Sequence, residues 1–363
     1  MDLVSRIDRL KRQSAFNFDA DLFIEMLTCL LSRRHGIVTV ERDVYLDFVE
    51  QMISLIGSNI FGFSTRTVVC SHTMTTEQFS DEILLPVEFT HGAFSPLPAS
   101  SADLEPSLSW NGFPKSLFNE PKIVPRDSNS GSRRLPNLVV IRDLSESSNY
   151  VQAQLLEILR TKKLVFSKGI FIPPPQFLVI PLISKDSLQR HLFPYLVDHF
   201  FISHNYNASN ANMKNAEFGR WQPPVRLPAA TLEVLFSSED IDALMVLSNK
   251  VKINADINRY MRDILVFLRM HRAIRGGIPA RAIKDFELLV RCLCPLHGIT
   301  YATPSIVSIA TRKTFTHRIA IPLPEDERSV AYGSQLDAVE KFLSYWTPDL
   351  VLDDIIDTVA APV

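Results

Sequence analysis

The chain has little cysteine and almost no net charge. Four cysteines occur in 363 residues, too few and too irregularly spaced for the disulfide framework of a secreted protein. A formal net charge of -2 gives no overall attraction to nucleic acid or to an anionic membrane. Basic residues are also not interleaved with aromatic ones, as a nucleic-acid groove requires. We therefore expect a cytoplasmic or nuclear protein with protein partners, without nucleic acid or membrane.

Long apolar runs and the common catalytic motifs are missing too. No window reaches the roughly 18 apolar residues of a membrane span, and the initial MDLVSRIDRLKRQ lacks the apolar core of a signal peptide. The chain has no Gly-x-Ser-x-Gly, His-Glu-x-x-His, Gly-x-Gly-x-x-Gly or Cys-x-x-Cys motif. Cys292, Cys294 and His297 supply too few ligands for zinc, and cysteines two apart on a helix diverge by roughly 200°. No metal site is predicted.

One stretch, residues 138–201, carries the clearest structural pattern. A β-branched apolar run covers residues 138–141, and Val151, Leu155 and Ile158 then repeat at helical spacing. Another continuous apolar run covers residues 177–180, which is typical of a strand covered on both faces. Strand, helix and strand in this order form a crossover unit of a parallel sheet. The sequence therefore predicts an α/β core.

The remaining patterns divide the chain into five parts. We predict an N-terminal helical segment over residues 1–34, an α/β core over 35–203, a linker over 204–231, a helical lid domain over 232–323 and a helical tail over 324–363. Within the core, the Pro- and Ser-rich residues 93–136 predict a flexible insertion. Apolar residues at helical spacing between positions 257 and 319 predict the bundle of the lid. The tail is amphipathic, so it docks on the lid or on a partner.

Two groups of residues carry a resemblance to a known family. The predicted helix contains Q-x-x-L-L-E, formed by Gln152, Leu155, Leu156 and Glu157, and the lid contains LRMHRAIRGGIPARA and FTHRI. These stretches resemble AAA+ ATPases of the magnesium-chelatase and MoxR type, over most of residues 35–350. The resemblance implies a P-loop-NTPase-like parallel-sheet core with a C-terminal helical lid. It also implies that His317 and Arg318 are structural residues at the end of a lid helix.

The phosphate-binding loop of that family, Walker A, is absent here. In the family it follows the strand that corresponds to residues 37–40, but this chain continues with Glu41, Arg42 and Asp43. Such a loop needs glycines whose N–H groups converge on phosphate and a lysine that reaches it. The segment from Gly57 to Ser64 has the glycine spacing but phenylalanine at the lysine position, and it follows a predicted helix. We do not expect it to bind phosphate.

The other nucleotide-site positions of the family, Walker B among them, are altered. By alignment, the magnesium-positioning aspartate falls on Arg142 and the catalytic glutamate on Asp143. Arginine has no lone pair for magnesium. The sensor-one asparagine corresponds to Ser184 and the trans-acting arginine finger to His199, while Arg281 retains the sensor-two arginine. Two roles are open for Arg281: an ion pair at the helix start, or a contact to an anion shared with Arg142.

Two functions follow from the resemblance. The first is a catalytically inactive AAA+-like protein without a cofactor, acting as an interaction or scaffold module for active AAA+ subunits or for itself. The alternative is a nucleotide-dependent, chelatase-like ATPase subunit with ATP and magnesium in an unusual or partner-completed site. Without the loop, several hydrogen bonds of about 1.5 to 3 kcal/mol each are lost. Micromolar affinity corresponds to only about 8 kcal/mol, so we expect no tight ATP binding.

Overall fold

A five-stranded parallel sheet forms the core of the chain. The computed structural model describes residues 18–86, 133–185, 192–206 and 236–362. The strands lie in the order β2 (Thr65–Val69), β5 (Leu138–Arg142), β8 (Leu178–Ser184), β1 (His35–Val40) and β9 (Phe200–Tyr206). Neighbouring strands are parallel throughout this sheet. The predicted α/β class with a parallel sheet is confirmed.

The strands read as continuous apolar runs because both faces of the sheet are covered. Side chains alternate between the faces, so Val140 and Ile180 belong to one hydrophobic cluster while Val139 and Val179 belong to the other. The first cluster continues into the C-terminal helices. The sheet and the helical region therefore share one continuous core.

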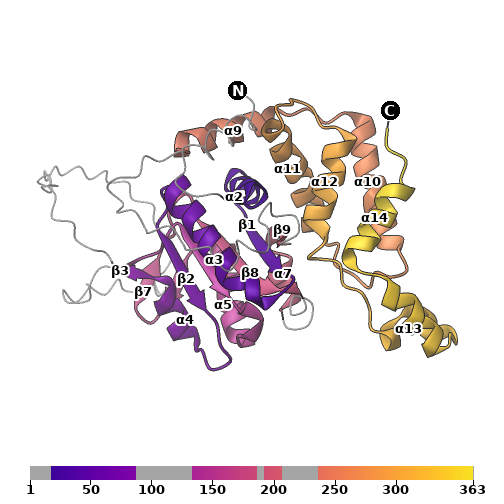
Figure 1. The fold of residues 1–363 in the computed structure, drawn as a ribbon, viewed down its shortest axis with the longest axis horizontal. Helices are drawn as coiled ribbons and strands as arrows, with labels where there is room; N and C mark the ends of the chain where they lie inside the picture. Colours follow the sequence, from indigo (N-terminus) through magenta and orange to yellow (C-terminus); the bar gives the residue numbers. More distant parts are fainter. Residues whose placement is uncertain (1–17, 87–132, 186–191, 207–235, 363) are drawn as a thin grey trace, which may run out of the picture.

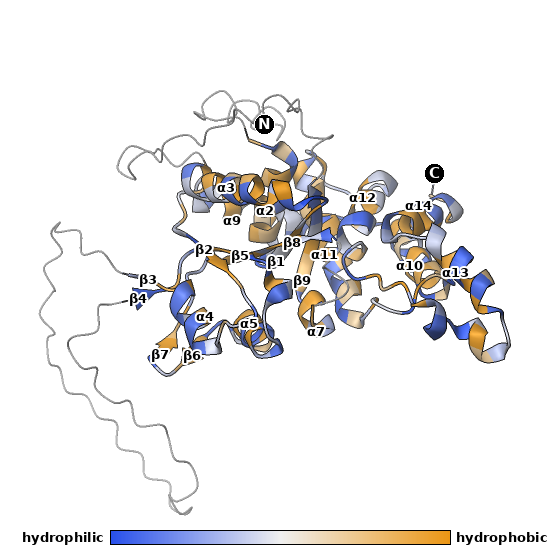
Figure 2. Ribbon diagram, turned by 60° about the horizontal axis from the view of Figure 1, so that its bottom comes forward, coloured by the Kyte–Doolittle hydropathy of each residue, from blue (hydrophilic) through white to orange (hydrophobic). Residues whose placement is uncertain are grey.

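Helices cover both faces of the sheet (Figures 1 and 2). One face carries α2 (Ala20–Ser32) and α3 (Leu46–Leu55), and the other carries α4 (Thr76–Ile83), α5 (Asn149–Thr161) and the short α7 (Pro194–Val197). Asp19 caps α2 by accepting a hydrogen bond from the backbone N–H of Asp21 at 2.8 Å. The described part of the predicted N-terminal helical segment therefore contains a helix over Ala20–Ser32.

Helix α2 connects the sheet to the helical region. It packs on β1 and β9 and also contacts α9 (Ser238–Lys250) and α11 (Ala280–Leu296). The approach to β1 is close, because a Cβ built on Gly36 would lie 2.9 Å from the Cys29 Sγ. On the same helix, the buried Glu25 carboxylate accepts a hydrogen bond from the Lys313 ammonium at 2.7 Å. Lys313 lies on α12 (Pro304–Phe315), so this pair also fixes the helical region to α2.

The C-terminal region is helical, as the sequence predicted. After α9 it contains α10 (Ala255–Met270), α11, α12, α13 (Leu336–Tyr345) and α14 (Pro348–Thr358). The amphipathic tail docks on the lid, because α14 contacts α10 and α12 and buries Val351, Leu352 and Ile355 in the shared core. Among the described residues, no helix is long and apolar enough to cross a membrane.

Several predicted segments lie partly outside the described residues. This holds for positions 93–132 of the predicted insertion, 207–231 of the predicted linker and the first 17 residues. The end of the insertion is ordered: β4 (Arg133–Arg134) pairs with β3 (Leu85–Pro86), and Arg133 donates to the Asp81 carboxylate at 2.9 Å. A second small hairpin joins β6 (Leu164–Phe166) and β7 (Gly169–Phe171).

Candidate functional site

The turn that follows β1 occupies the position where a phosphate loop was expected. β1 ends at Val40, and a single 3-10 turn over Asp43–Tyr45 leads directly into α3. This turn contains no glycine, and its first residues Glu41, Arg42 and Asp43 are exposed. A helix N-terminus attracts anions, but the first turn of α3 already carries the carboxylate of Asp47.

Arg142, at the end of β5, is held by carboxylates of α3. Its guanidinium donates to Asp47 and, at 3.0 Å, to the Glu50 Oε2. Burial acts to lower the pKa of Arg142, but hydrogen bonds to Glu50 and Asp47 outweigh it and the pKa is raised. The side chain therefore neutralises α3 carboxylates and fixes α3 to β5.

Asp143 adds a further carboxylate to this end of the sheet. Its backbone is left-handed, with φ of 53°, and it precedes the 3-10 turn Leu144–Glu146. Burial raises the pKa of Asp143; Arg142 opposes this, whereas Asp43, Glu146 and Asp47 raise it further. We call this surface the acidic edge, made up of Glu41, Asp43, Asp47, Glu50, Asp143 and Glu146.

The residues of the acidic edge do not suit ATP and magnesium bound in the way that AAA+ ATPases bind them. Ser184 lies there too, at the end of β8 and in register with Val40. The turn after β1 supplies neither glycines nor a lysine, and Arg142 pairs with Asp47 and Glu50 and lies 4.0 Å from the Asp143 Oδ2. Triphosphate placed here would face carboxylates of the same sign.

Basic side chains gather at the opposite end of the sheet, where the strands begin. Arg34 precedes β1, Arg160 lies in the last turn of α5, and Lys162 caps that helix with φ of 54°. His199 lies between α7 and β9, and Arg281 lies in the first turn of α11. We call these five residues the basic edge.

Several side chains of the basic edge influence one another's pKa values. Burial lowers the pKa of Arg281, and Arg34 and Arg160 lower it further, while Asp285 and Asp198 oppose them. Burial also lowers the pKa of His199; the Tyr195 carbonyl raises it, and Arg281 and Arg160 lower it. Cations from three separate segments therefore act on the same small region.

The structure divides the five predicted site residues into two groups. Arg142, Asp143 and Ser184 lie at the end where β5 and β8 finish, whereas His199 and Arg281 lie where β9 and β1 begin. Arg142 and Arg281 therefore do not form a shared anion site. The Arg281 Nε instead lies 3.8 Å from the Asp285 Oδ2, one helical turn along α11.

His317 and Arg318 join the helical region to β9. The His317 Nε2 lies 3.0 Å from the carbonyl oxygen of Phe200, and the Arg318 Nη2 donates to that oxygen at 2.7 Å. The same nitrogen donates to the Asp285 Oδ2 at 2.8 Å, and neither side chain of this pair is more than 2% exposed. The predicted structural role of His317 and Arg318 agrees with these contacts. Asp285 was missed, although its i,i+4 spacing from Arg281 was a usable signal.

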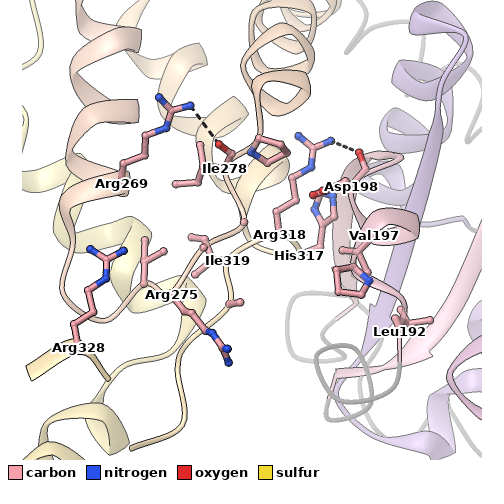
Figure 3. Close-up of a pocket in the computed structure, with 16 residues that line it drawn as sticks. Leu192, Val197, Asp198, Arg269, Arg275, Ile278, His317, Arg318, Ile319 and Arg328 are labelled. Carbon is pink, nitrogen blue, oxygen red and sulfur yellow. Dashed lines mark hydrogen bonds between the residues drawn. The ribbon is translucent and has the colours of Figure 1, made fainter. Parts of the chain in front are cut away.

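A cavity of about 740 Å³ lies beside this connection (Figure 3). Val197 and Asp198 line it from the core, and Arg269, Arg275, Arg328 and the Gly276–Gly277 loop line it from the helical region. Arg275 pairs with Asp326 at 2.7 Å and Arg269 donates to the Ile278 carbonyl at 3.3 Å. A Cβ on Gly277, whose φ is +110°, would lie 1.8 Å from the Arg318 carbonyl oxygen. The loop thus packs directly against the segment that follows α12.

Cysteine and metal chemistry adds nothing to these surfaces. Cys292 and Cys294 are buried in the helical region, and burial raises the pKa of Cys292 to about 12 and of Cys294 to about 11. Within the described residues, no group of three or more His, Cys, Asp or Glu side chains is placed to hold a metal ion.

The comparisons with curated sequences find short matches. No family model matches the chain. It is 32% identical over 101 residues to "Maintenance of telomere capping protein 2" of Kluyveromyces lactis, covering 26% of this chain and 37% of that protein. The protein of the same name from Lachancea thermotolerans is 31% identical over 114 residues, and this match covers 30% of this chain and 40% of that protein. The chain therefore spans about two fifths of the length of these relatives.

The comparison with solved structures supports the fold. An ATPase candidate from Cytophaga hutchinsonii superimposes with a TM-score of 0.64 at 11% identity, covering 99% of this chain and 94% of that chain. A full-length MCM homolog from Methanopyrus kandleri gives a TM-score of 0.45 at 10% identity, and the match covers 82% of this chain and 55% of that chain. At such identity the first likeness shows the fold alone: an α/β core with a helical C-terminal region.

Proposed function

We propose that this chain is an AAA+-like protein that works without nucleotide, as a protein-interaction module. The observation that carries the proposal is the acidic edge. Carboxylates of Asp43, Asp47 and Asp143 stand at the strand ends where an ATPase of this fold would hold phosphate. Arg142, which replaces a magnesium ligand, holds two of the carboxylates in place rather than facing a ligand.

The energetics favour this proposal over an ATP site. Two like charges about 4 Å apart repel by about 4 kcal/mol at the effective dielectric constant near a protein surface. Micromolar binding requires only about 8 kcal/mol in total. Two such contacts would therefore cancel the affinity of an ordinary nucleotide site.

The name of the curated relatives points to a biological process in which the chain acts. Their printed name refers to the maintenance of telomere capping. Within the proposal, the chain acts in the nucleus as one member of a protein assembly that serves such a process. Because the matched stretch covers about two fifths of those proteins, only the shared stretch supports this part of the proposal.

Calorimetric titration tests the proposal directly. The purified, folded chain is titrated with ATP and with ADP, with and without magnesium, up to millimolar nucleotide. We expect no binding heat. A variant with Asp43→Asn and Asp47→Asn is the matched comparison, because it removes like charge from the same site. Micromolar binding by the unaltered chain would refute the proposal.

One observation favours a second function, in which the chain completes the ATP site of an active partner. Arg281 and His199 lie near one another at the basic edge, away from the chain's own acidic edge. A half-buried guanidinium and a half-buried imidazole at this edge are placed to contact phosphate held by another subunit. Stimulation of a partner's ATPase rate by this chain, lost with Arg281→Ala, would support this function. Stimulation unaffected by that change would exclude it.

A further inference from the structure

Lys162 of the basic edge also lines a second cavity, of about 350 Å³. The cavity lies where the C-terminal ends of α2 and α5 meet the first two turns of α9, and the segments that lead into β5 and β8 complete its walls. It is therefore at the end of the sheet opposite to the acidic edge. Its volume is at the lower end of the range of ligand pockets, which is about 300 to 1,000 Å³.

The inner wall of this cavity is apolar. Leu30, Phe177 and Ile241 line it and are no more than 7% exposed, and the half-buried Met245 lies beside them. The Phe177 ring is the aromatic ring of this wall, and it packs edge-on against the His35 ring with the centroids 5.7 Å apart. The cavity therefore suits a bulky apolar side chain better than a nucleobase, which binds by stacking on exposed rings.

The rim of the cavity is basic. Arg33 and Lys162 end α2 and α5 in the left-handed conformation, with φ of 51° and 54°, and the Lys162 ammonium donates to the Arg33 carbonyl oxygen at 3.5 Å. The two helix ends thus bring both side chains to the same rim. Arg33 lies 3.8 Å from the Asp242 carboxylate, but both side chains are more than 60% exposed, so this pair contributes little.

Positive charge continues from the rim along the basic edge. Burial lowers the pKa of Lys162, and Arg34 and Arg33 lower it further; Arg34 also acts on Arg281 in the same direction. Among the residues that the structure describes, no salt bridge involves Arg34, Arg160 or Lys162. Gathered cations repel one another, so a partner that brings several carboxylates is attracted to this surface.

We propose that the cavity and the cations beside it bind an acidic peptide segment of a partner protein. One bulky apolar side chain of the segment enters the cavity against Leu30 and Ile241, and carboxylates on either side of it pair with Arg33, Arg34 and Lys162. The apolar side chain fixes the register, and the charges supply attraction at a distance. This assignment rests on the proposed function, because it gives the interaction module a partner of defined chemistry.

Fluorescence anisotropy with labelled peptides tests the proposal. Each probe has one apolar residue, leucine, isoleucine, methionine, phenylalanine or tryptophan, between runs of aspartate and glutamate. We expect at least one probe to bind the full chain with a micromolar Kd at about 50 mM salt, and at least about tenfold more weakly at about 500 mM salt. Replacing the apolar residue by serine should weaken binding at least tenfold. If none of the probes binds, or if the serine peptide binds equally well, the proposal is overturned.

Charge reversal at the rim identifies the surface. Arg33→Glu with Lys162→Glu should weaken binding of the best probe at least tenfold, and circular dichroism melting checks that this variant folds. Lys250→Glu with Arg262→Glu makes the same change in net charge on exposed parts of α9 and α10, and it should bind like the unaltered chain. Equal losses in the two variants would show that only total charge matters and would overturn the proposal.

A cavity-filling variant tests the apolar part of the site. Ser238 is exposed at the start of α9 and lines the cavity, so Ser238→Trp should occupy part of the space and reduce the preference for the apolar peptide over the serine peptide. An unchanged preference would overturn the placement of the apolar side chain.

Two further titrations separate this proposal from its alternatives. A single-stranded DNA oligonucleotide with the same number of negative charges should bind at least tenfold more weakly than the best peptide, and tighter binding of the DNA would overturn the peptide assignment. Calorimetric binding of ATP by a chain that also binds the peptide would refute nucleotide independence and leave the peptide site standing. A chain that binds neither would overturn the peptide site alone.

Discussion

The buried ion pair between Arg318 and Asp285 allows a sharp test of how the helical region is fixed to the sheet. Arg318→Met removes the guanidinium while keeping much of its volume. It leaves the Asp285 carboxylate, which is 2% exposed, without its 2.8 Å partner. The Phe200 carbonyl oxygen also loses a 2.7 Å hydrogen bond, while the His317 ring nitrogen stays 3.0 Å from it.

The expected cost is large for a single substitution. Breaking a buried pair by removing one partner typically costs about 3 to 5 kcal/mol, because the other charge stays buried. Replacing both partners by apolar residues is often close to neutral. The double variant Arg318→Met with Asp285→Leu should therefore recover most of the stability that the single variant loses.

Urea unfolding followed by circular dichroism measures the effect. With a slope of about 3 kcal/mol per molar urea, the single variant should shift the midpoint down by about 1 to 2 M. Arg312→Ala is the control, since its pair with Asp353 is about half exposed and should contribute less than about 1 kcal/mol. A loss in Arg318→Met no larger than in this control would refute the reasoning. So would a double variant less stable than the single one.

Two further predictions concern the packing and the pH dependence of the core. Gly36→Val should destabilise the chain by about 1 to 3 kcal/mol, because a Cβ there would meet the Cys29 Sγ at 2.9 Å. The control in thermal unfolding is Gly276→Ala, because a Cβ at Gly276 meets nothing within 4 Å. Equal losses of stability in the two variants would contradict the packing argument. Burial lowers the pKa of both His35 and His204 to about 3, so the unfolded chain binds protons first as the pH falls below about 6.5. The free energy of unfolding should then fall toward pH 3 by up to about 1.4 kcal/mol per pH unit for each histidine. In His35→Gln this free energy should depend less steeply on pH. An unchanged pH dependence in that variant would contradict the lowered pKa of His35.

Much of the fold could be predicted from local patterns. The continuous apolar runs ending at Ile141 and Ile180 indicated buried parallel strands, and both lie in the central sheet. Helical spacing between positions 257 and 319 predicted a helical bundle, and α10, α11 and α12 lie there. The absence of a glycine-rich loop after Val40 was also visible in the sequence, because a phosphate loop requires particular residues at adjacent positions.

The structural roles of other residues could not be predicted from local sequence patterns. Gln152 was noted as part of a helix motif, but its side chain is fully buried and its Oε1 accepts from the Phe193 backbone N–H at 2.8 Å. The partner lies 41 residues away on the segment before α7. No periodicity within α5 indicates such a contact, because it depends on how two distant segments pack.

By itself, the sequence determined the buried strands at residues 138–141 and 177–180, the α/β class and the absence of a glycine-rich loop after Val40, since each is encoded in neighbouring residues. Only the tertiary structure decided that Arg142 pairs with Asp47 and Glu50, and that Arg281 lies at the other end of the sheet. The reason is physical. Hydrophobic periodicity records which face of an element is buried, whereas the partner of a charge depends on which elements meet in space.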